Sequence, residues 1–214
     1  MRVAPPSSDS DRKVLRRRLL ALRRDVPAPL RRDAASRATA HARRCGLLAP
    51  GRSIGLYVAM RTEFDTGPLR NAALSLGCHV FVPRIVRWRG RRMQFLRQHA
   101  GGRLHFNRYG LAEPAARSSR PLAARRFDVV FVPLVGIDPT GTRLGMGGGY
   151  YDRYFAFRRR HRALRKPRLI GLAYDFQRVP FIERAPWDVP LDGVLTESGF
   201  YRTGHSRAGW GEPR

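Results

Sequence analysis

The stretch FDVVFVPLVGID, residues 127–138, constrains the fold of this chain more than any other feature. It is the most apolar run in the protein, and β-branched side chains dominate it. A strand that is apolar at every position, rather than at alternate ones, is typical of a strand buried on both faces between layers of helices. We therefore expect residues 127–138 to form a central strand of a largely parallel sheet.

The segments before this run support a parallel arrangement. SIGLYVAM (53–60) and HVFVPRI (79–85) are expected strands separated by one helix, within about thirty residues. Such a βαβ unit favours parallel pairing. Further strands are expected at 91–98, 168–175 and 192–196, helices at 11–24, 31–46 and 149–162, and an irregular polar connection from His99 to Arg126.

The length of 214 residues allows one sizeable core and leaves little room for two. We expect a single α/β domain over residues 11–202, with a disordered N-terminal tail at 1–10 and a flexible C-terminal tail at 203–214. Cys45 and Cys78 are too few for a disulfide framework, so we expect reduced thiols. No apolar run approaches a signal peptide core or the roughly 18 residues of a membrane helix, and we expect a cytoplasmic location.

The formal net charge is +26, and every basic residue except Lys13 and Lys166 is arginine. The arginines are spread over nearly every segment rather than gathered in one. The resulting field attracts polyanions, but it does not choose among nucleotides, cofactors rich in carboxylates and nucleic acid.

A glycine-rich stretch, RLGMGGGYYDRYF at 143–155, follows the expected central strand and opens a helix. Ligands of open α/β sheets bind at this position, and bare glycines let backbone N–H groups approach a phosphate. The stretch matches neither G-x-G-x-x-G nor a loop ending in G-K-[ST]. Glycine content alone favours a phosphate cradle and a plain tight turn equally. Arg143 and Asp152 favour the cradle, because a guanidinium can neutralise charge and a carboxylate can hold Mg²⁺.

Four blocks in order resemble the 5-formyltetrahydrofolate cyclo-ligase family, also called 5,10-methenyltetrahydrofolate synthetase. VPLVGIDPTGTRLGMGGGYYDRYF (132–155) is similar to the family's R-L-G-x-G-x-G-Y-Y-D signature. LYVAMRTEFDT (56–66), FNRYGLAEP (106–114) and the block from 170 to 197 resemble its other conserved stretches. The likeness extends from about residue 11 to residue 197.

The resemblance implies a three-layer α/β/α fold with a mainly parallel sheet, akin to phosphosugar isomerases and CoA-transferases. It also implies an ATP- and Mg²⁺-dependent conversion of 5-formyltetrahydrofolate to 5,10-methenyltetrahydrofolate, with release of ADP and phosphate. We expect a monomer whose partners are these small molecules, with no specific nucleic acid and no membrane.

The resemblance also assigns site residues. Two aspartates, Asp152 and Asp188, would bind the metal. The chain departs from the family at Gly148, where some members have lysine, and at Trp187, where many have histidine; whether Arg12 or Lys13 fills the N-terminal basic position stays open. The folate contacts would be Val58, Glu63, Tyr109, Met146, Gly147, Gly148, Gly149 and Tyr150. The ATP contacts would be Arg12, Lys13, Arg16, Arg143, Leu144, Gly145, Met146, Gly147, Gly148, Gly149, Tyr150 and Tyr151, with Arg143 and Tyr151 as catalytic candidates.

Two other functions remain as alternatives. The net charge and LRRRLLALRR (15–24) would suit a nucleic-acid-binding module, although no recognition motif accompanies them. The chain could also be a relative on the same fold that is inactive or acts as an isomerase or transferase, because a fold does not determine its chemistry.

Overall fold

The computed structural model describes residues 9–87, 92–99, 101–102, 104–106, 112–114, 120–160, 166–204 and 209–213. Its helices are α1 (Asp9–Arg24), α2 (Ala28–Arg44), α3 (Gly67–Ser75), α4 (Tyr150–Tyr154) and α5 (Phe157–Arg160), with short 3₁₀ turns at Ala124–Arg126 and Asp175–Gln177. Its strands are β1 (Ser53–Leu56), β2 (His79–Arg87), β3 (Arg92–Gln98), β4 (Leu104–Phe106), β5 (Ala112–Pro114), β6 (Val129–Pro133), β7 (Gly136–Ile137), β8 (Arg143–Leu144), β9 (Arg168–Leu172), β10 (Gly193–Leu195) and β11 (Phe200–Arg202).

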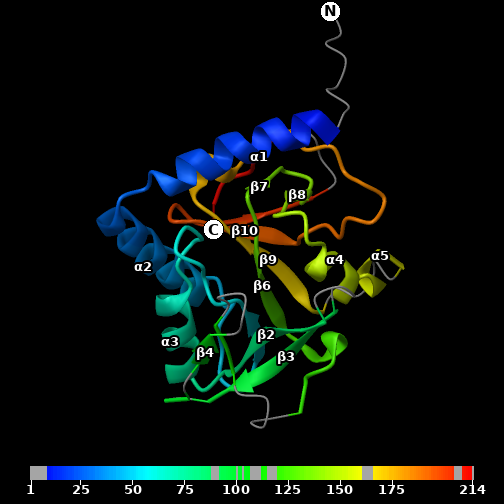
Figure 1. The fold of residues 1–214 in the computed structure, drawn as a ribbon. Coiled ribbons are helices and arrows are strands. Elements are labelled where there is room, and N and C mark those ends of the chain that lie inside the picture. The colour runs from blue at the N-terminus through cyan, green and yellow to red at the C-terminus, as the bar shows by residue number, and fades with distance from the viewer. Residues whose placement is uncertain are drawn as a thin grey trace, which may run out of the picture.

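The main sheet has seven strands in the order β11-β10-β9-β6-β1-β2-β3. The five central strands β10, β9, β6, β1 and β2 are parallel to one another, and the edge strands β11 and β3 pair antiparallel with β10 and β2. Helices α2 and α3 cover one face, and α4 and α5 cover the other (Figure 1). The predicted three-layer α/β/α fold with a mainly parallel sheet is confirmed.

Strand β6 lies at the centre of the sheet, as its apolar run predicts. Val129 and Phe131 pack into the core under α2 and α3, whereas Val130 and Val132 pack into the core on the opposite face. All four side chains are at most 1% exposed. Burial of each stabilises the fold by roughly 1.5–3 kcal/mol, so this one strand ties the two outer layers together.

Several expected elements are shorter than their apolar runs. Strand β6 ends at Pro133 rather than 138, because the chain then leaves the sheet and β7 forms a hairpin with β8. The strand expected at 53–60 ends at Leu56, and the one expected at 168–175 ends at Leu172. The helix expected at 149–162 is two short helices, α4 and α5. These early strand ends leave loops at the carboxyl edge of the sheet, where the candidate site lies.

The chain changes direction across the sheet between β1 and β6. β1 continues through α3 to its neighbour β2, whereas β6 continues through α4 and α5 to β9 on its other side. Loops that leave adjacent parallel strands in opposite directions open a crevice beyond the carboxyl ends of those strands. The topology therefore places the expected binding site beyond β1 and β6.

Among the described residues, Cys45 and Cys78 form no disulfide, as expected. In the part of the chain that the structure describes, no helix has both the length and the apolar character needed to cross a bilayer. The tail boundaries at residues 10 and 203 stay predictions.

Candidate active site

The glycine-rich loop connects β8 to α4, so the β7–β8 hairpin separates it from the central strand. Gly147 and Gly149 have φ angles of 89° and 62°, a left-handed backbone that side chains disfavour. A Cβ on Gly149 would also lie 2.9 Å from Arg153 Nη1. The glycines are therefore required for the shape of the loop. Helix α4 has only five residues, so the N–H groups of the loop, rather than a long helix dipole, would have to hold an anion.

Helix α1 crosses the loop and presents two arginines to the site. Arg16 Nε donates to the Gly145 carbonyl at 2.9 Å. One helical turn earlier, Arg12 Nη1 donates to Asp188 Oδ2 at 3.1 Å and also to the Glu183 carbonyl. Lys13 is exposed at the next position on α1. Of the two candidates for the N-terminal basic position, Arg12 contacts the segment that carries Asp188.

Arg143 is buried and holds the first of these aspartates. Its Nη2 donates to Asp152 Oδ1 at 2.7 Å, and its Nη1 donates to the Val189 carbonyl at 2.8 Å. The same Asp152 oxygen accepts the Val189 N–H at 3.0 Å. Arg143, Asp152 and Val189 thus fasten the start of α4 to the segment that carries Asp188.

Asp188 closes a turn. Its Oδ2 accepts the Ala185 N–H at 3.0 Å, and its own N–H donates to the Ala185 carbonyl at 3.0 Å. The side chain is 9% exposed and forms an ion pair with Arg12. The two predicted metal ligands therefore come from neighbouring segments, each carboxylate facing one arginine.

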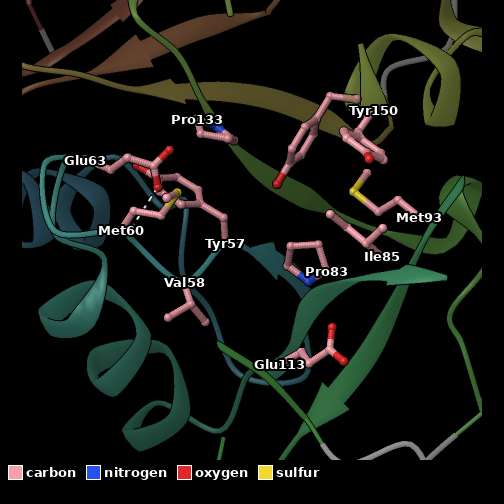
Figure 2. A pocket seen from close by; sticks show the side chains of 11 residues that line it. Tyr57, Val58, Met60, Glu63, Pro83, Ile85, Met93, Glu113, Pro133 and Tyr150 are labelled. Atoms are coloured by element: carbon pink, nitrogen blue, oxygen red, sulfur yellow. Dashed lines mark hydrogen bonds between the residues drawn. The ribbon is translucent and has the colours of Figure 1, made fainter. Parts of the chain in front are cut away.

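A pocket opens beyond the carboxyl ends of β1, β2 and β6, at the predicted crevice. Figure 2 shows Glu63 on one side of it and Tyr150 on the other, with Pro133 of β6 between them. The glycine loop contributes Tyr150 and Tyr151 to its wall. The lining residues are Tyr57, Val58, Met60, Glu63, Pro83, Ile85, Met93, Glu113, Pro133, Tyr150 and Tyr151.

Two ionisable groups in this wall are shielded from solvent. Burial raises the pKa of Glu63, although its Oε2 accepts the Met60 N–H at 2.9 Å, which works in the opposite direction. Burial also raises the pKa of the Tyr151 phenol. The Tyr151 hydroxyl is buried without a hydrogen-bond partner among the described residues. An unsatisfied buried hydroxyl is costly, so a ligand that accepted a hydrogen bond from it would be favoured here.

The structure gathers most of the predicted site residues into two adjoining regions. Val58, Glu63, Tyr150 and Tyr151 line the pocket, and Arg12, Arg16 and the loop from Gly145 to Gly149 lie beside Asp152 and Asp188. Leu144 is buried in a small core with Leu19 of α1, so its side chain supports the loop. Tyr109 lies outside the described residues.

Sequence reasoning missed part of the pocket wall. Pro83 and Ile85 are two positions apart on β2 and therefore share one face of the strand. Met93 comes from its partner strand β3. Their period of two was visible in the sequence, but which face would meet the crevice was not. Glu113 was also missed; it lines the pocket and lies 3.4 Å from Arg84 Nε.

Asp138 is a buried carboxylate behind the loop, and its replacement should destabilise the protein. It is 1% exposed; its Oδ1 accepts the N–H groups of Thr140 and Thr142, and its Oδ2 accepts that of Ile182. Asp138→Ala would leave these N–H groups without their acceptor, which should lower the free energy of unfolding by about 3–5 kcal/mol. Urea denaturation measures this loss.

The matched control is Asp33→Ala, whose exposed carboxylate lies 3.8 Å from Arg37 on α2. It should change the free energy of unfolding by less than about 0.5 kcal/mol. Equal urea midpoints for Asp138→Ala and Asp33→Ala would show that Asp138 does not hold the β7–β8 hairpin to the Ile182 segment.

Comparison with known proteins identifies close similarity over nearly the whole domain. A sequence model of the 5-formyltetrahydrofolate cyclo-ligase family matches residues 8–197. The 5-formyltetrahydrofolate cyclo-ligase of Escherichia coli K12 is 33% identical over 146 residues, covering 68% of this chain and 78% of that protein. The Haemophilus influenzae protein of the same name is 29% identical over 184 residues, covering 86% and 96%.

Solved structures show the same fold. The 5,10-methenyltetrahydrofolate synthetase of Aquifex aeolicus superposes with a TM-score of 0.75 at 26% identity, covering 91% of this chain and 95% of that one. The synthetase of Mycoplasma pneumoniae superposes with a TM-score of 0.66 at 22% identity, covering 87% and 99%.

Proposed function

Because this chain belongs to the 5-formyltetrahydrofolate cyclo-ligase family, we propose that it uses ATP to close 5-formyltetrahydrofolate to 5,10-methenyltetrahydrofolate. Membership of this family identifies the chain as an enzyme of folate one-carbon metabolism, in agreement with the names of its relatives. ATP, Mg²⁺, the order of steps and the residue roles given below are our proposal.

The reaction needs activation of a poor leaving group. The formyl oxygen on N5 cannot be displaced by N10 as it stands. Transfer of the γ-phosphoryl group to that oxygen releases ADP and forms an iminium-like phosphate ester. N10 then attacks the formyl carbon and gives up its proton, the C–O bond breaks, and phosphate departs carrying the former formyl oxygen. Phosphoryl transfer depends mainly on positioning and charge neutralisation, which a loop of backbone N–H groups and arginines can provide.

The phosphates would bind on the α1 side of the loop. Gly145 to Gly149 would offer backbone N–H groups, and Arg12 and Arg16 would supply positive charge from α1. Arg143 is buried behind Asp152, so we assign it to holding that carboxylate in place as well as to the charge near the transferred group.

The two aspartates fit a magnesium ion. Asp152 accepts its hydrogen bonds from Arg143 and Val189 on Oδ1, and Asp188 accepts its own from Arg12 and Ala185 on Oδ2. Among the described residues, the other oxygen of each carboxylate accepts no hydrogen bond. Mg²⁺ is commonly held by one or two carboxylates together with substrate phosphates. When bound, it would neutralise charge on the phosphate oxygens.

The folate would bind in the pocket on the other side of the loop. Glu63 would accept hydrogen bonds from the N–H donors of the pterin ring, as carboxylates do well. Tyr150 and Tyr151 line the other side of the pocket and begin α4 directly after the glycine loop, so the formyl group would lie next to the phosphate cradle. The observation that carries this proposal is that a single loop contributes both to the pocket and to the arginine and aspartate cluster.

The test is direct. Purified protein mixed with ATP, Mg²⁺ and 5-formyltetrahydrofolate should develop the absorbance of the methenyl product, with one ADP released for each product. Replacing ATP with AMP should prevent product formation, because AMP has no γ-phosphoryl group. Product without ADP, or folded protein that forms no product, would contradict the proposal.

A further inference from the structure

Two large apolar side chains project into solvent beside the phosphate side of the loop. Met146 is 64% exposed and Trp187 is 65% exposed. Met146 lies within the glycine loop, and Trp187 directly precedes Asp188. Each lies next to a residue that contacts an arginine of the predicted phosphate site, so both offer apolar surface close to it.

Helix α1 contacts the residue next to each of them. Arg16 binds the carbonyl of Gly145, the neighbour of Met146, and Arg12 binds the carboxylate of Asp188, the neighbour of Trp187. Arg12 and Arg16 are four positions apart, one turn of a helix, and therefore share a face of α1. The backbones that carry Met146 and Trp187 are thus held on adjacent turns of the same helix.

The position of Trp187 is set before any ligand binds. Its turn is closed by Asp188, whose carboxylate accepts the Ala185 N–H, and is fastened at Pro186, whose carbonyl accepts Arg159 Nη1 at 2.9 Å. Arg12 adds a hydrogen bond to the Glu183 carbonyl. A tryptophan whose backbone is anchored in this way loses less entropy when a ligand stacks on its ring than one on a loose loop would.

We infer that Trp187, together with Met146, contacts the base of the bound nucleotide. The inference rests on the proposed function. If the phosphates lie on the loop and the folate fills the pocket beyond Tyr150 and Tyr151, the base must extend away from the pocket. Val14 and Phe181, on α1 and before the Asp188 turn, are also partly exposed, but Trp187 and Met146 are the most exposed large apolar side chains of these segments. An indole stacks on a purine, and a thioether packs against an aromatic ring.

Such a contact recognises a flat ring rather than a pattern of hydrogen bonds. Stacking on an aromatic side chain is tolerant of base identity, and its loss on alanine substitution weakens binding by roughly 5- to 150-fold. Trp187→Ala should therefore weaken the binding of ADP and the binding of GDP by similar factors. It should leave the binding of tripolyphosphate, which has no base, within about twofold of wild type.

Titration calorimetry of the full chain, with Mg²⁺ present, measures all three ligands. Trp187→Phe keeps a stacking ring and should regain most of the lost ADP affinity. Trp210→Phe is the matched control, because Trp210 packs against Tyr201 with ring centroids 6.0 Å apart and is assigned no role in the site. ADP, but not tripolyphosphate, should also quench tryptophan fluorescence in wild type and in Trp210→Phe, and not in Trp187→Phe.

Three results would overturn the inference. Unchanged ADP affinity in Trp187→Ala would exclude a base contact. An equal loss of affinity for ADP and for tripolyphosphate would show that the substitution acts through Asp188 or the loop. If wild-type protein bound neither ligand, the proposed function itself would fail, which distinguishes that failure from the loss of stacking alone.

Discussion

Replacing Asp152 with asparagine should reduce the turnover number by about 100- to 1,000-fold while leaving the protein folded. Asparagine keeps an oxygen that can accept hydrogen bonds from Arg143 and Val189, so the start of α4 should stay fastened to the Val189 segment. It removes the negative charge that we propose holds Mg²⁺ against the phosphates. Steady-state kinetics over a range of Mg²⁺ concentrations measures the effect, and the concentration for half-maximal rate should rise.

The choice of asparagine over alanine matters. Asp152→Ala would leave the buried guanidinium of Arg143 without its carboxylate, and breaking such a pair costs about 3–5 kcal/mol of stability. An inactive alanine variant could then simply be unfolded. Asp33→Asn, on the exposed surface of α2, serves as the control and should keep wild-type kinetics. Unaltered turnover and unaltered Mg²⁺ dependence in Asp152→Asn would refute the metal assignment.

Replacing Glu63 with glutamine should raise the KM for 5-formyltetrahydrofolate by about 10- to 100-fold and leave the Kd for ADP unchanged. A hydrogen bond to a charged group is worth roughly 1.5–3 kcal/mol, and the glutamine amide would also place N–H groups against the N–H donors of the pterin. Separate measurements of folate KM and ADP affinity distinguish the two sites. A similar weakening of folate binding and of ADP binding would argue that Glu63 shapes the loop rather than binding the pterin.

The pH dependence of the folate KM provides a second measure of Glu63. Burial raises the pKa of Glu63 above the ordinary glutamate value of 4.5, so it takes up a proton at a higher pH than an exposed glutamate. The wild-type KM should therefore rise as pH falls through this raised pKa. Glu63→Gln should lack that rise, and Glu212→Gln, at an exposed position near the C-terminus, should retain it.

Ionisation of Glu63 favours folate binding but lowers the free energy of unfolding. A carboxylate with a raised pKa costs folding free energy while it is ionised, at pH values above its folded pKa, and the cost disappears as pH falls through that value. The neutral amide carries no such cost. Glu63→Gln should therefore unfold in urea at a midpoint no lower than wild type near neutral pH, which separates its effect on folate binding from misfolding.

The sequence pattern predicted the layers of the fold because the relevant information is local. The unbroken apolar run around Phe131 indicated burial on both faces, and Val130 and Val132 do face the core opposite to that of Phe131. The glycine run indicated a loop whose backbone needs left-handed angles, and Gly147 and Gly149 have them. Strand ends were predicted poorly, because loops at the carboxyl edge continue the apolar composition of their strands.

The candidate site was predictable as a set of residue types but not as a set of contacts. The family motifs named Arg143 and Asp152, yet nothing in their spacing showed that the two would pair behind the loop at 2.7 Å. The arginines of α1 occur in a helix that is basic all round, so only the family resemblance singled out Arg16, and it left Arg12 and Lys13 as alternatives. The packing of Leu19 against Leu144 turns that face of α1 toward the loop.

What the sequence by itself determined is the alternation of strands and helices, the bare backbone of the loop and the kinds of side chain available for phosphate, metal and pterin. These follow from backbone conformational limits and side-chain periodicity, which act over a few residues. Only the tertiary structure decided which charges meet. Arg12 and Asp188 are 176 positions apart, and their contact exists because α1 packs across the end of a sheet whose strands come mostly from the residues between them.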